Sequence, residues 1–376
     1  MAKRTLDSFF QRAISPPQKR SKPSEINNPQ DNQDPPSQHP TYPSPIAQLP
    51  SHIEVGLVHT TPAAAPRTIN NQPHLDLLYF QPYIARTTAN ELFKFLRREV
   101  PFYRVQYNIR RGDTETQITT PRFTTVFGVD ETSKFVPRSS ANTNTNTNTN
   151  RPQSNTSTPG NEDHPASLIL VDSSTNEPIP TSKKYHSTPR PIPTCLDLLR
   201  KQVEDISQTT YNICLVNYYA SGEDSIAFHS DDERFLGSNP TIASLSLGAE
   251  RDFLMKHKPV VTPEAGRDTP GAGPPPPSKS NSTPNLNSGG SDARPLKLGL
   301  ASGDMVIMRG ATQSNWLHSI PKRKGKAAER SIQGRINITF RKAVVPAGTN
   351  NYYHYNVGDG GVFRWDETQR RMVRSD

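Results

Sequence analysis

The chain contains 376 residues, of which 37 are proline and only 32% are hydrophobic. This composition excludes one packed body that includes every residue, because Pro-rich polar tracts bury too little apolar surface to offset chain entropy. Two cysteines exclude a disulfide framework and a four-cysteine zinc module, and the absence of a signal peptide or a bilayer-length apolar run predicts an intracellular, soluble protein. The formal net charge of +9 favours a polyanionic partner, although a basic tail alone gives the same balance.

The first ordered elements are expected near His74. Residues 1–70 are rich in Pro, Gln, Asn and Ser and are expected to form a disordered arm. LDLLYFQPYI (75–84) has the composition of a strand. Thr88, with Glu91 three residues later, predicts a capping box at the start of a helix that continues through Leu92, Phe95 and Leu96.

Two low-complexity segments interrupt the chain after this point. Residues 139–182 contain NTNTNTNTN, and residues 258–295 contain GAGPPPPSKSNSTPNLNSGG, so both are expected to be disordered insertions in one domain. Between them, Thr194 and Asp197 are expected to open a second helix, with apolar residues at helical spacing: Leu196, Leu199, Val203 and Ile206.

Strands are expected to dominate the second half of the chain. Four segments are short, rich in β-branched or aromatic residues and separated by turn residues: 211–220, 241–255, 302–310 and 335–344. Successive strands without intervening helices favour an antiparallel sheet or barrel-like sandwich fronted by two helices, a mostly β fold of the α+β class. The domain is expected to span 71–346, with 347–376 packed on it as a small turn-and-helix extension.

A row of polar side chains lies along one face of the strand RINITFR. Alternate residues of a strand share a face, so one face carries only polar side chains: Arg335, Asn337, Thr339 and Arg341. This face either points to solvent or is buried around an anion. Asn217 and Tyr219 form a second row on YNICLVNYY, and together the rows could hold a small dicarboxylate, which arginine grips at two points.

A candidate metal site follows the strand that carries Asn217 and Tyr219. His229 and Asp231 are two residues apart, and His318 in SNWLHSIPK is the best third ligand. Two histidines and one carboxylate are typical of non-haem Fe(II) oxygenases, and the same set can hold zinc.

These motifs, in this order, resemble the AlkB family of Fe(II)- and 2-oxoglutarate-dependent dioxygenases, in particular its nuclear DNA-repair branch, here with fungal-like low-complexity insertions. The resemblance rests on NYYASGEDSIAFHSDDE, LSLGAERDF, DMVIMRGATQSNWLHSIPK and RINITFRK. It implies a double-stranded β-helix (jelly-roll) core, with Fe(II), 2-oxoglutarate and O2 as cofactors. It further implies that His229, Asp231 and His318 bind iron, and that a set of polar residues binds 2-oxoglutarate: Asn217, Tyr219, Arg335, Asn337, Thr339 and Arg341.

The resemblance also implies a reaction, the oxidative demethylation of N1-methyladenine and N3-methylcytosine in double- or single-stranded DNA, with release of formaldehyde, succinate and CO2. Asp232, and secondarily Glu233, are expected to complement the positive charge of these bases. Phe127 in PRFTTVFG is expected to stack on the flipped base, and Tyr107 or Asn108, in a hairpin around Arg111-Gly112-Asp113, to fill the gap it leaves. The alternatives are an RNA demethylase and a non-enzymatic DNA- or clamp-binding protein with an inactive site.

The first ten residues, MAKRTLDSFF, carry an apolar cluster that is unusual in a disordered arm. Leu6, Phe9 and Phe10 resemble the box with which repair proteins bind the sliding clamp PCNA, although Lys3 stands where that box has glutamine. PPQKRSK is similar to a nuclear localisation signal. We therefore expect a monomeric nuclear protein without a membrane association.

Overall fold

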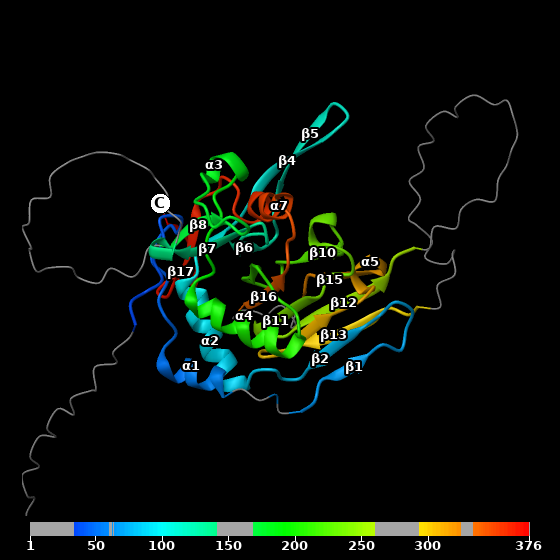
Figure 1. Cartoon of the computed structure of the whole chain (residues 1–376). Helices are drawn as coiled ribbons and strands as arrows, with labels where there is room; N and C mark the ends of the chain where they lie inside the picture. Colours follow the sequence, from blue (N-terminus) through cyan, green and yellow to red (C-terminus); the bar gives the residue numbers. More distant parts are fainter. Residues whose placement is uncertain are drawn as a thin grey trace, which may run out of the picture. The chain divides into compact units, whose positions relative to one another are not determined.

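The computed structural model describes residues 34–59, 62, 64–140, 168–259, 293–324 and 334–375 (Figure 1). All of them lie within one compact unit, Asp34–Asp376. None of the helices in these ranges is long and apolar enough to cross a membrane.

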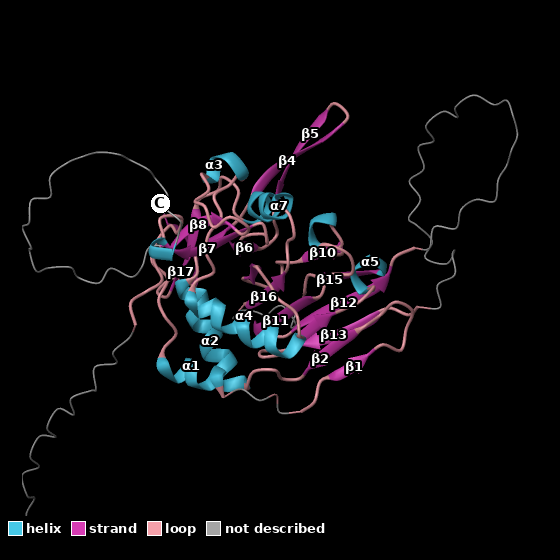
Figure 2. Ribbon diagram, viewed as in Figure 1, coloured by secondary structure: helices cyan, strands magenta, loops and turns pink. Residues whose placement is uncertain are grey.

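Two antiparallel sheets form the core of this unit (Figure 2). The main sheet has ten strands, in the spatial order β1 (Arg67–Ile69), β2 (Leu77–Phe80), β14 (Met305–Met308), β11 (Ile242–Gly248), β16 (Arg335–Arg341), β9 (Ile213–Tyr219), β6 (Phe123–Gly128), β3 (Phe102–Tyr103), β17 (Val362–Asp366) and β18 (Arg371–Ser375). The second sheet has four strands, in the order β10 (Ile226–His229), β15 (Trp316–Ile320), β12 (Arg251–His257) and β13 (Leu296–Leu300). Strands β9 to β16 divide equally between the sheets, as β14-β11-β16-β9 and β10-β15-β12-β13, which is a double-stranded β-helix. The expected jelly-roll fold is therefore confirmed.

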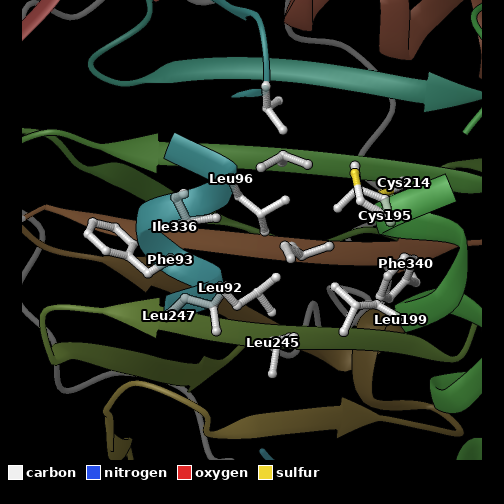
Figure 3. Close-up of a cluster of buried hydrophobic side chains, with 14 of the residues drawn as sticks. Leu92, Phe93, Leu96, Cys195, Leu199, Cys214, Leu245, Leu247, Ile336 and Phe340 are labelled. Carbon is white, nitrogen blue, oxygen red and sulfur yellow. The ribbon is translucent and has the colours of Figure 1, made fainter. Parts of the chain in front are cut away.

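Helices α2 (Arg86–Glu99) and α4 (Thr194–Ser207) cover the outer face of the main sheet. Figure 3 shows Leu92, Phe93 and Leu96 of α2 packing toward Ile336 and Leu247 of the sheet, and Cys195 and Leu199 of α4 lying beside Cys214 and Phe340. The helical spacing of the apolar residues correctly predicted the buried positions, namely Leu92, Phe95 and Leu96 in α2 and Leu196, Leu199 and Val203 in α4, whereas Ile206 is only partly buried. Helix α1 (Ser51–Val58) packs against α2.

The expected capping signals do not start these helices. Helix α2 begins after Ala85, no side chain caps its N-terminus, and Glu91 instead pairs with Lys94 at 2.8 Å. Helix α4 begins at Thr194 as expected but also lacks a side-chain cap, and Asp197 pairs with Arg200. The capping-box prediction was wrong because the tertiary contacts of the apolar face, rather than local capping, set where α2 begins.

Order extends further than the sequence predicted. Within the expected disordered arm, residues 34–59 carry buried apolar side chains, namely Tyr42, Ile46, Leu49, Ile53 and Leu57. Within the expected insertion 139–182, β8 (Leu168–Asp172) pairs with β7 (Ser133–Pro137) and is followed by α3 (Thr181–Lys184). The prediction of disorder was wrong for these two segments, because their few apolar side chains pack against the domain although the surrounding sequence is polar. Residues 141–167 and 260–292 lie outside the described residues.

Turns and short elements complete the fold. The segment 241–255 forms two strands, β11 and β12. Strand β11 ends at Gly248, which has a φ of +85° and where a Cβ atom would lie 2.6 Å from the carbonyl oxygen of Gly334. The expected hairpin consists of β4 (Gln106–Arg111) and β5 (Thr114–Thr119), joined at Gly112. The remaining short helices are η1 (Arg138–Ser140), η2 (Arg234–Leu236) and α5 (Thr312–Asn315).

The C-terminal extension is larger than a turn and a helix. Helix α7 (Pro346–Asn356) contacts β6, and the hairpin β17–β18 then extends the main sheet beyond β3. In Figure 1 the hairpin β4–β5 projects from the body, and α7 lies near its base. The extension is thus part of the domain, and α7 lies beside the polar residues of β16.

Candidate active site

The polar row of β16 is buried, so the alternative that this face points to solvent is wrong. Arg335, Asn337, Thr339 and Arg341 are each at least nine-tenths buried and line a cavity of about 350 Å³. The alternate residues Ile336, Ile338 and Phe340 belong to the core beneath the helices. Arg341 is paired with Asp231, whereas Arg335 has only neutral hydrogen-bond partners among the described residues, so the cavity favours an anionic ligand beside Arg335, because a buried cation requires a partner.

The three expected metal ligands meet on the wall of this cavity. Strands β10 and β15 pair antiparallel with His229 directly opposite His318, and their ring centroids lie 4.2 Å apart. Asp231 follows β10, and its Oδ2 atom lies 3.9 Å from Nε2 of His318. Strand pairing therefore brings together residues from distant parts of the sequence.

The ionisation of these residues fits a divalent metal. Burial lowers the pKa of His318 to about 3 and also lowers the pKa of His229, so both imidazoles are neutral at pH 7. Burial acts to raise the pKa of Asp231, but the charge and hydrogen bonds of Arg341, together with His318 and His229, outweigh it and hold this pKa at about 2. Two neutral imidazoles and an ionised carboxylate are the forms that bind Fe(II).

Both candidate histidine ligands keep a ring nitrogen that could bind a metal. Nδ1 of His318 is buried without a hydrogen-bond partner, whereas Nδ1 of His229 lies 2.9 Å from the carbonyl oxygen of Ala227, which leaves Nε2 for a ligand. Among the described residues no three His, Cys, Asp or Glu side chains already form a closed metal site.

Arg335 has unused donors that face the cavity. Its Nη2 donates to Oγ of Ser246 at 2.8 Å, while Nε and Nη1 are buried without partners. Burial lowers the pKa of Arg335 to about 10, so it remains charged at pH 7. The Tyr219 ring lies 5.3 Å from its guanidinium carbon. A buried, charged guanidinium with unpartnered donors suits an anionic ligand such as a carboxylate.

Amide and hydroxyl groups beside Arg335 hold one another in place. Nδ2 of Asn337 donates to Oγ of Ser244 at 2.8 Å, and Oγ1 of Thr339 donates to Oδ1 of Asn337 at 3.2 Å. Asn217 accepts a hydrogen bond of 2.8 Å from Nε of Arg122. Sequence reasoning missed Arg122, although it directly precedes β6 in the motif PRFTTVFG.

The acidic residues after Asp231 are placed differently from the sequence prediction. Asp232 is exposed, pairs with Lys258 and accepts a hydrogen bond of 2.9 Å from Ser230. Glu233 lines the cavity, and its Oε2 atom is buried without a hydrogen-bond partner. Burial and the neighbouring Asp231 raise the pKa of Glu233. The structure therefore favours Glu233 over Asp232 as the acidic side chain that faces the cavity, because Asp232 pairs with Lys258 at the surface.

Phe127 is not available to stack on a base. It is fully buried in the helix-facing core, and its ring meets Tyr42 edge-on at 5.9 Å between centroids. Odd-numbered residues of β6 face the helices, so the period of the strand directs Phe127 away from the cavity. Its predicted role in substrate binding is contradicted.

The hairpin residues divide between two surfaces. Tyr107 lines both the cavity and a neighbouring groove, whereas Asn108 is exposed and lines only that groove, with Arg104 and Gln117. The clamp-like residues Leu6, Phe9 and Phe10 lie outside the described residues.

Helix α7 supplies cavity residues that the sequence did not reveal: Asn351, Tyr352, Tyr355 and Asn356. The Tyr352 ring lies 5.4 Å from the guanidinium carbon of Arg341, and its hydroxyl is buried without a partner. The only signal in the sequence was the aromatic run NYYHYN, which does not say where its side chains point.

Comparison with known proteins agrees with this geometry. Residues 76–341 match the model of the 2OG-Fe(II) oxygenase superfamily, and that range includes the three candidate metal ligands and the row on β16. The chain is 36% identical over 143 residues to "Alpha-ketoglutarate-dependent dioxygenase alkB homolog 3" of Mus musculus. The aligned region covers 38% of this chain and 40% of the relative.

Two further relatives carry the name "DNA oxidative demethylase ALKBH2". The Arabidopsis thaliana protein is 37% identical over 131 residues, covering 35% of this chain and 37% of the relative. The Homo sapiens protein is 33% identical over 150 residues, covering 40% of this chain and 46% of the relative. The matches thus span less than half the length of these relatives. By its family match, its jelly-roll fold and these similarities, the chain belongs to the 2OG-Fe(II) oxygenase superfamily and is of the AlkB type, with Fe(II), 2-oxoglutarate and O2 as cofactors.

Proposed function

We propose that the protein is an oxidative demethylase that repairs N-alkylated bases in DNA, chiefly N1-methyladenine and N3-methylcytosine, and releases formaldehyde, succinate and CO2. The observation that carries the proposal is one buried cavity that is lined both by His229, Asp231 and His318 and by the arginine row of β16. The similarity to proteins named DNA oxidative demethylase supports DNA as the substrate.

His229, Asp231 and His318 hold the iron in this proposal. Iron bound there, with 2-oxoglutarate and O2, supplies the oxidising chemistry that hydroxylates the N-methyl group. Arg341 holds the Asp231 carboxylate ionised and oriented through two hydrogen bonds.

The 2-oxoglutarate site lies on β16 and β9. Arg335 donates from its free Nη1 to the distal carboxylate of 2-oxoglutarate, because this buried donor has no protein partner among the described residues. Four further polar residues line the space beside it: Asn217, Tyr219, Asn337 and Thr339.

Glu233 recognises the alkylated base. N1-methyladenine and N3-methylcytosine carry a positive charge and an exocyclic amino group, and the buried Oε2 of Glu233 is an acceptor without a donor. The base must leave its stack to reach this depth. The projecting hairpin β4–β5, with Arg110 on its exposed surface, contacts the phosphate backbone.

The decisive experiment is product analysis on oligonucleotides that carry a single N1-methyladenine, as single- and double-stranded DNA and as RNA. Formaldehyde release and restored adenine on DNA support the proposal, and turnover confined to RNA identifies an RNA demethylase instead. Anaerobic titration with Fe(II) and 2-oxoglutarate tests for an inactive relative, since a protein with a dead site fails to bind one of them.

A second proposal concerns a binding partner and the location of the protein in the cell. Leu6, Phe9 and Phe10 bind the PCNA clamp, and the basic cluster PPQKRSK directs the monomer to the nucleus. In a titration of the N-terminal peptide with PCNA, Phe9→Ala with Phe10→Ala abolishes binding, and the same change in the full chain leaves demethylation of short oligonucleotides intact. Clamp binding that survives the double substitution refutes the assignment.

A further inference from the structure

Two histidines from different sheets meet at the surface of the domain. His74 lies in the connection between β1 and β2 of the main sheet, and His257 is the last residue of β12 in the second sheet. Nδ1 of His74 lies 3.4 Å from Nε2 of His257, and this contact is exposed to solvent. In Figure 1 the turn between β1 and β2 lies beside the end of β12. Neither histidine lines the cavity that contains the candidate iron ligands.

The distance between the two nitrogen atoms fits a shared metal ion better than a direct hydrogen bond. An N–H donor normally lies about 2.7–3.2 Å from its acceptor, so 3.4 Å is long for such a bond. Two nitrogen ligands of a tetrahedral zinc ion, each about 2.0–2.1 Å from the metal, lie about 3.3–3.4 Å apart. The two imidazoles are therefore already spaced as neighbouring corners of a zinc site.

The hydrogen bond on the far side of the His257 ring fixes which nitrogen carries the proton. Nδ1 of His257 lies 2.7 Å from the carbonyl oxygen of Lys258, which can only accept, so Nδ1 is protonated and Nε2 presents its lone pair toward His74. Metal-binding histidines usually donate their other N–H to a carbonyl or carboxylate in this way. The ammonium group of Lys258 pairs with Asp232, which reduces its repulsion of a cation.

One buried tryptophan holds both histidines in place. Trp316 donates from Nε1 to the carbonyl oxygen of Pro73 at 3.0 Å, and its ring meets that of His257 edge-on with centroids 5.4 Å apart. His74, next to Pro73, has a φ of +59°, which is uncommon for a residue other than glycine. Both imidazoles are thus positioned before a metal binds, as a preformed site requires.

We propose that His74 and His257 bind a divalent cation of the zinc class at a second metal site, separate from the iron site. Neutral imidazoles without a carboxylate favour zinc, nickel or copper over magnesium or calcium, and water completes the coordination. Bound metal joins the β1–β2 turn of one sheet to the end of β12 in the other. This site goes beyond the proposed function and does not depend on it, because it links the stability of the domain to zinc rather than to catalysis.

The test counts zinc ions bound by the full chain. The iron site can also take zinc, so the background is His229→Ala with His318→Ala, which removes both of its imidazoles but keeps the buried pair of Asp231 and Arg341. Equilibrium dialysis against zinc alone is expected to show one bound equivalent in this background. In the unsubstituted chain two equivalents are expected.

Two further substitutions are made in both backgrounds. His257→Ala removes one ligand, and His74→Asn removes the other with a residue that tolerates the left-handed backbone. Each is expected to lose one zinc equivalent, which leaves none in the iron-site variant and one in the otherwise unsubstituted chain. His52→Ala, an exposed histidine on α1, is the matched control and is expected to lose none.

Thermal unfolding supplies a second measurement. Zinc that binds only the folded chain raises its Tm, so zinc is expected to stabilise the iron-site variant but to have no effect once His74 or His257 is also replaced. Two outcomes overturn the proposal. One is a single zinc equivalent in the unsubstituted chain together with none in the iron-site variant, and the other is a second equivalent that survives both His257→Ala and His74→Asn.

Discussion

Nη2 of Arg341 donates to both carboxylate oxygens of Asp231, at 3.0 and 2.9 Å, and both side chains are buried. Asp231 in turn raises the pKa of Arg341 further above its usual range, although burial alone lowers it. The two arginines of β16 are therefore not equivalent. One holds a candidate metal ligand, and the other, Arg335, keeps donors free for a ligand.

The first prediction separates the two arginines. Arg341→Met leaves the Asp231 carboxylate buried without its cation, so the free energy of unfolding of the metal-free protein is expected to fall by about 3 kcal/mol in a denaturant titration. Arg335→Met removes a buried cation that has no carboxylate partner, so stability is expected to stay level or rise, while the Kd for 2-oxoglutarate rises about 30-fold, which corresponds to about 2 kcal/mol. An unchanged Kd for 2-oxoglutarate in Arg335→Met excludes this residue from the cosubstrate site.

The second prediction concerns the metal. Single alanine substitutions of His229, Asp231 and His318 are expected to abolish both Fe(II) binding and formaldehyde release, because each removes one of three protein ligands. His186→Ala is the matched control, since the His186 side chain does not line the cavity. Chelation of iron with EDTA is expected to stop wild-type turnover, and added Fe(II) is expected to restore it. A ligand variant that retains full Fe(II) affinity removes that residue from the site.

The third prediction distinguishes the two acidic residues after Asp231. Glu233→Gln is expected to lower kcat/KM for N1-methyladenine by about tenfold and to affect neutral etheno-adenine less, because the charge that faces the cation is lost. Asp232→Asn is expected to leave both activities nearly unchanged, since its carboxylate pairs with Lys258 at the surface. The reverse order of effects would restore Asp232 as the substrate contact.

The fourth prediction tests the place of Phe127. Phe127→Ala is expected to destabilise the protein by about 3 to 5 kcal/mol through the cavity it creates, whereas Phe127→Leu is expected to cost less. Because the ring faces the helices, the KM of folded Phe127→Leu for methylated DNA should equal that of the wild type. A raised KM with unchanged stability points to a substrate contact after all.

Much of the site could be read from the sequence where a strand imposes its period. The row from Arg335 to Arg341 faces one cavity because alternate residues of β16 share a side, and His229 meets His318 because two strands pair. The candidate metal ligands were recognised for a different reason, namely the order and spacing of their motifs, which resemble those of a known family.

Prediction failed where a side chain is oriented by a distant partner. Asp232 turns outward toward Lys258, which is remote in sequence, and Glu233 turns inward as the chain enters η2. Tyr355 reaches the cavity only because Thr349 and Tyr353 fasten α7 to the core. Local patterns carry no information on such long-range contacts. Residues 34–59 were likewise misjudged, because a polar composition hid the few apolar residues that find a packed partner.

The pairing of β10 with β15 also has a consequence for how the protein is made. His229 and His318 become neighbours only after the chain between them has formed β11 to β14 and returned, so the closure is highly non-local and comes late in folding. A chain that ends before β15 therefore lacks both His318 and the strand that pairs with β10, so the three candidate metal ligands cannot meet in it.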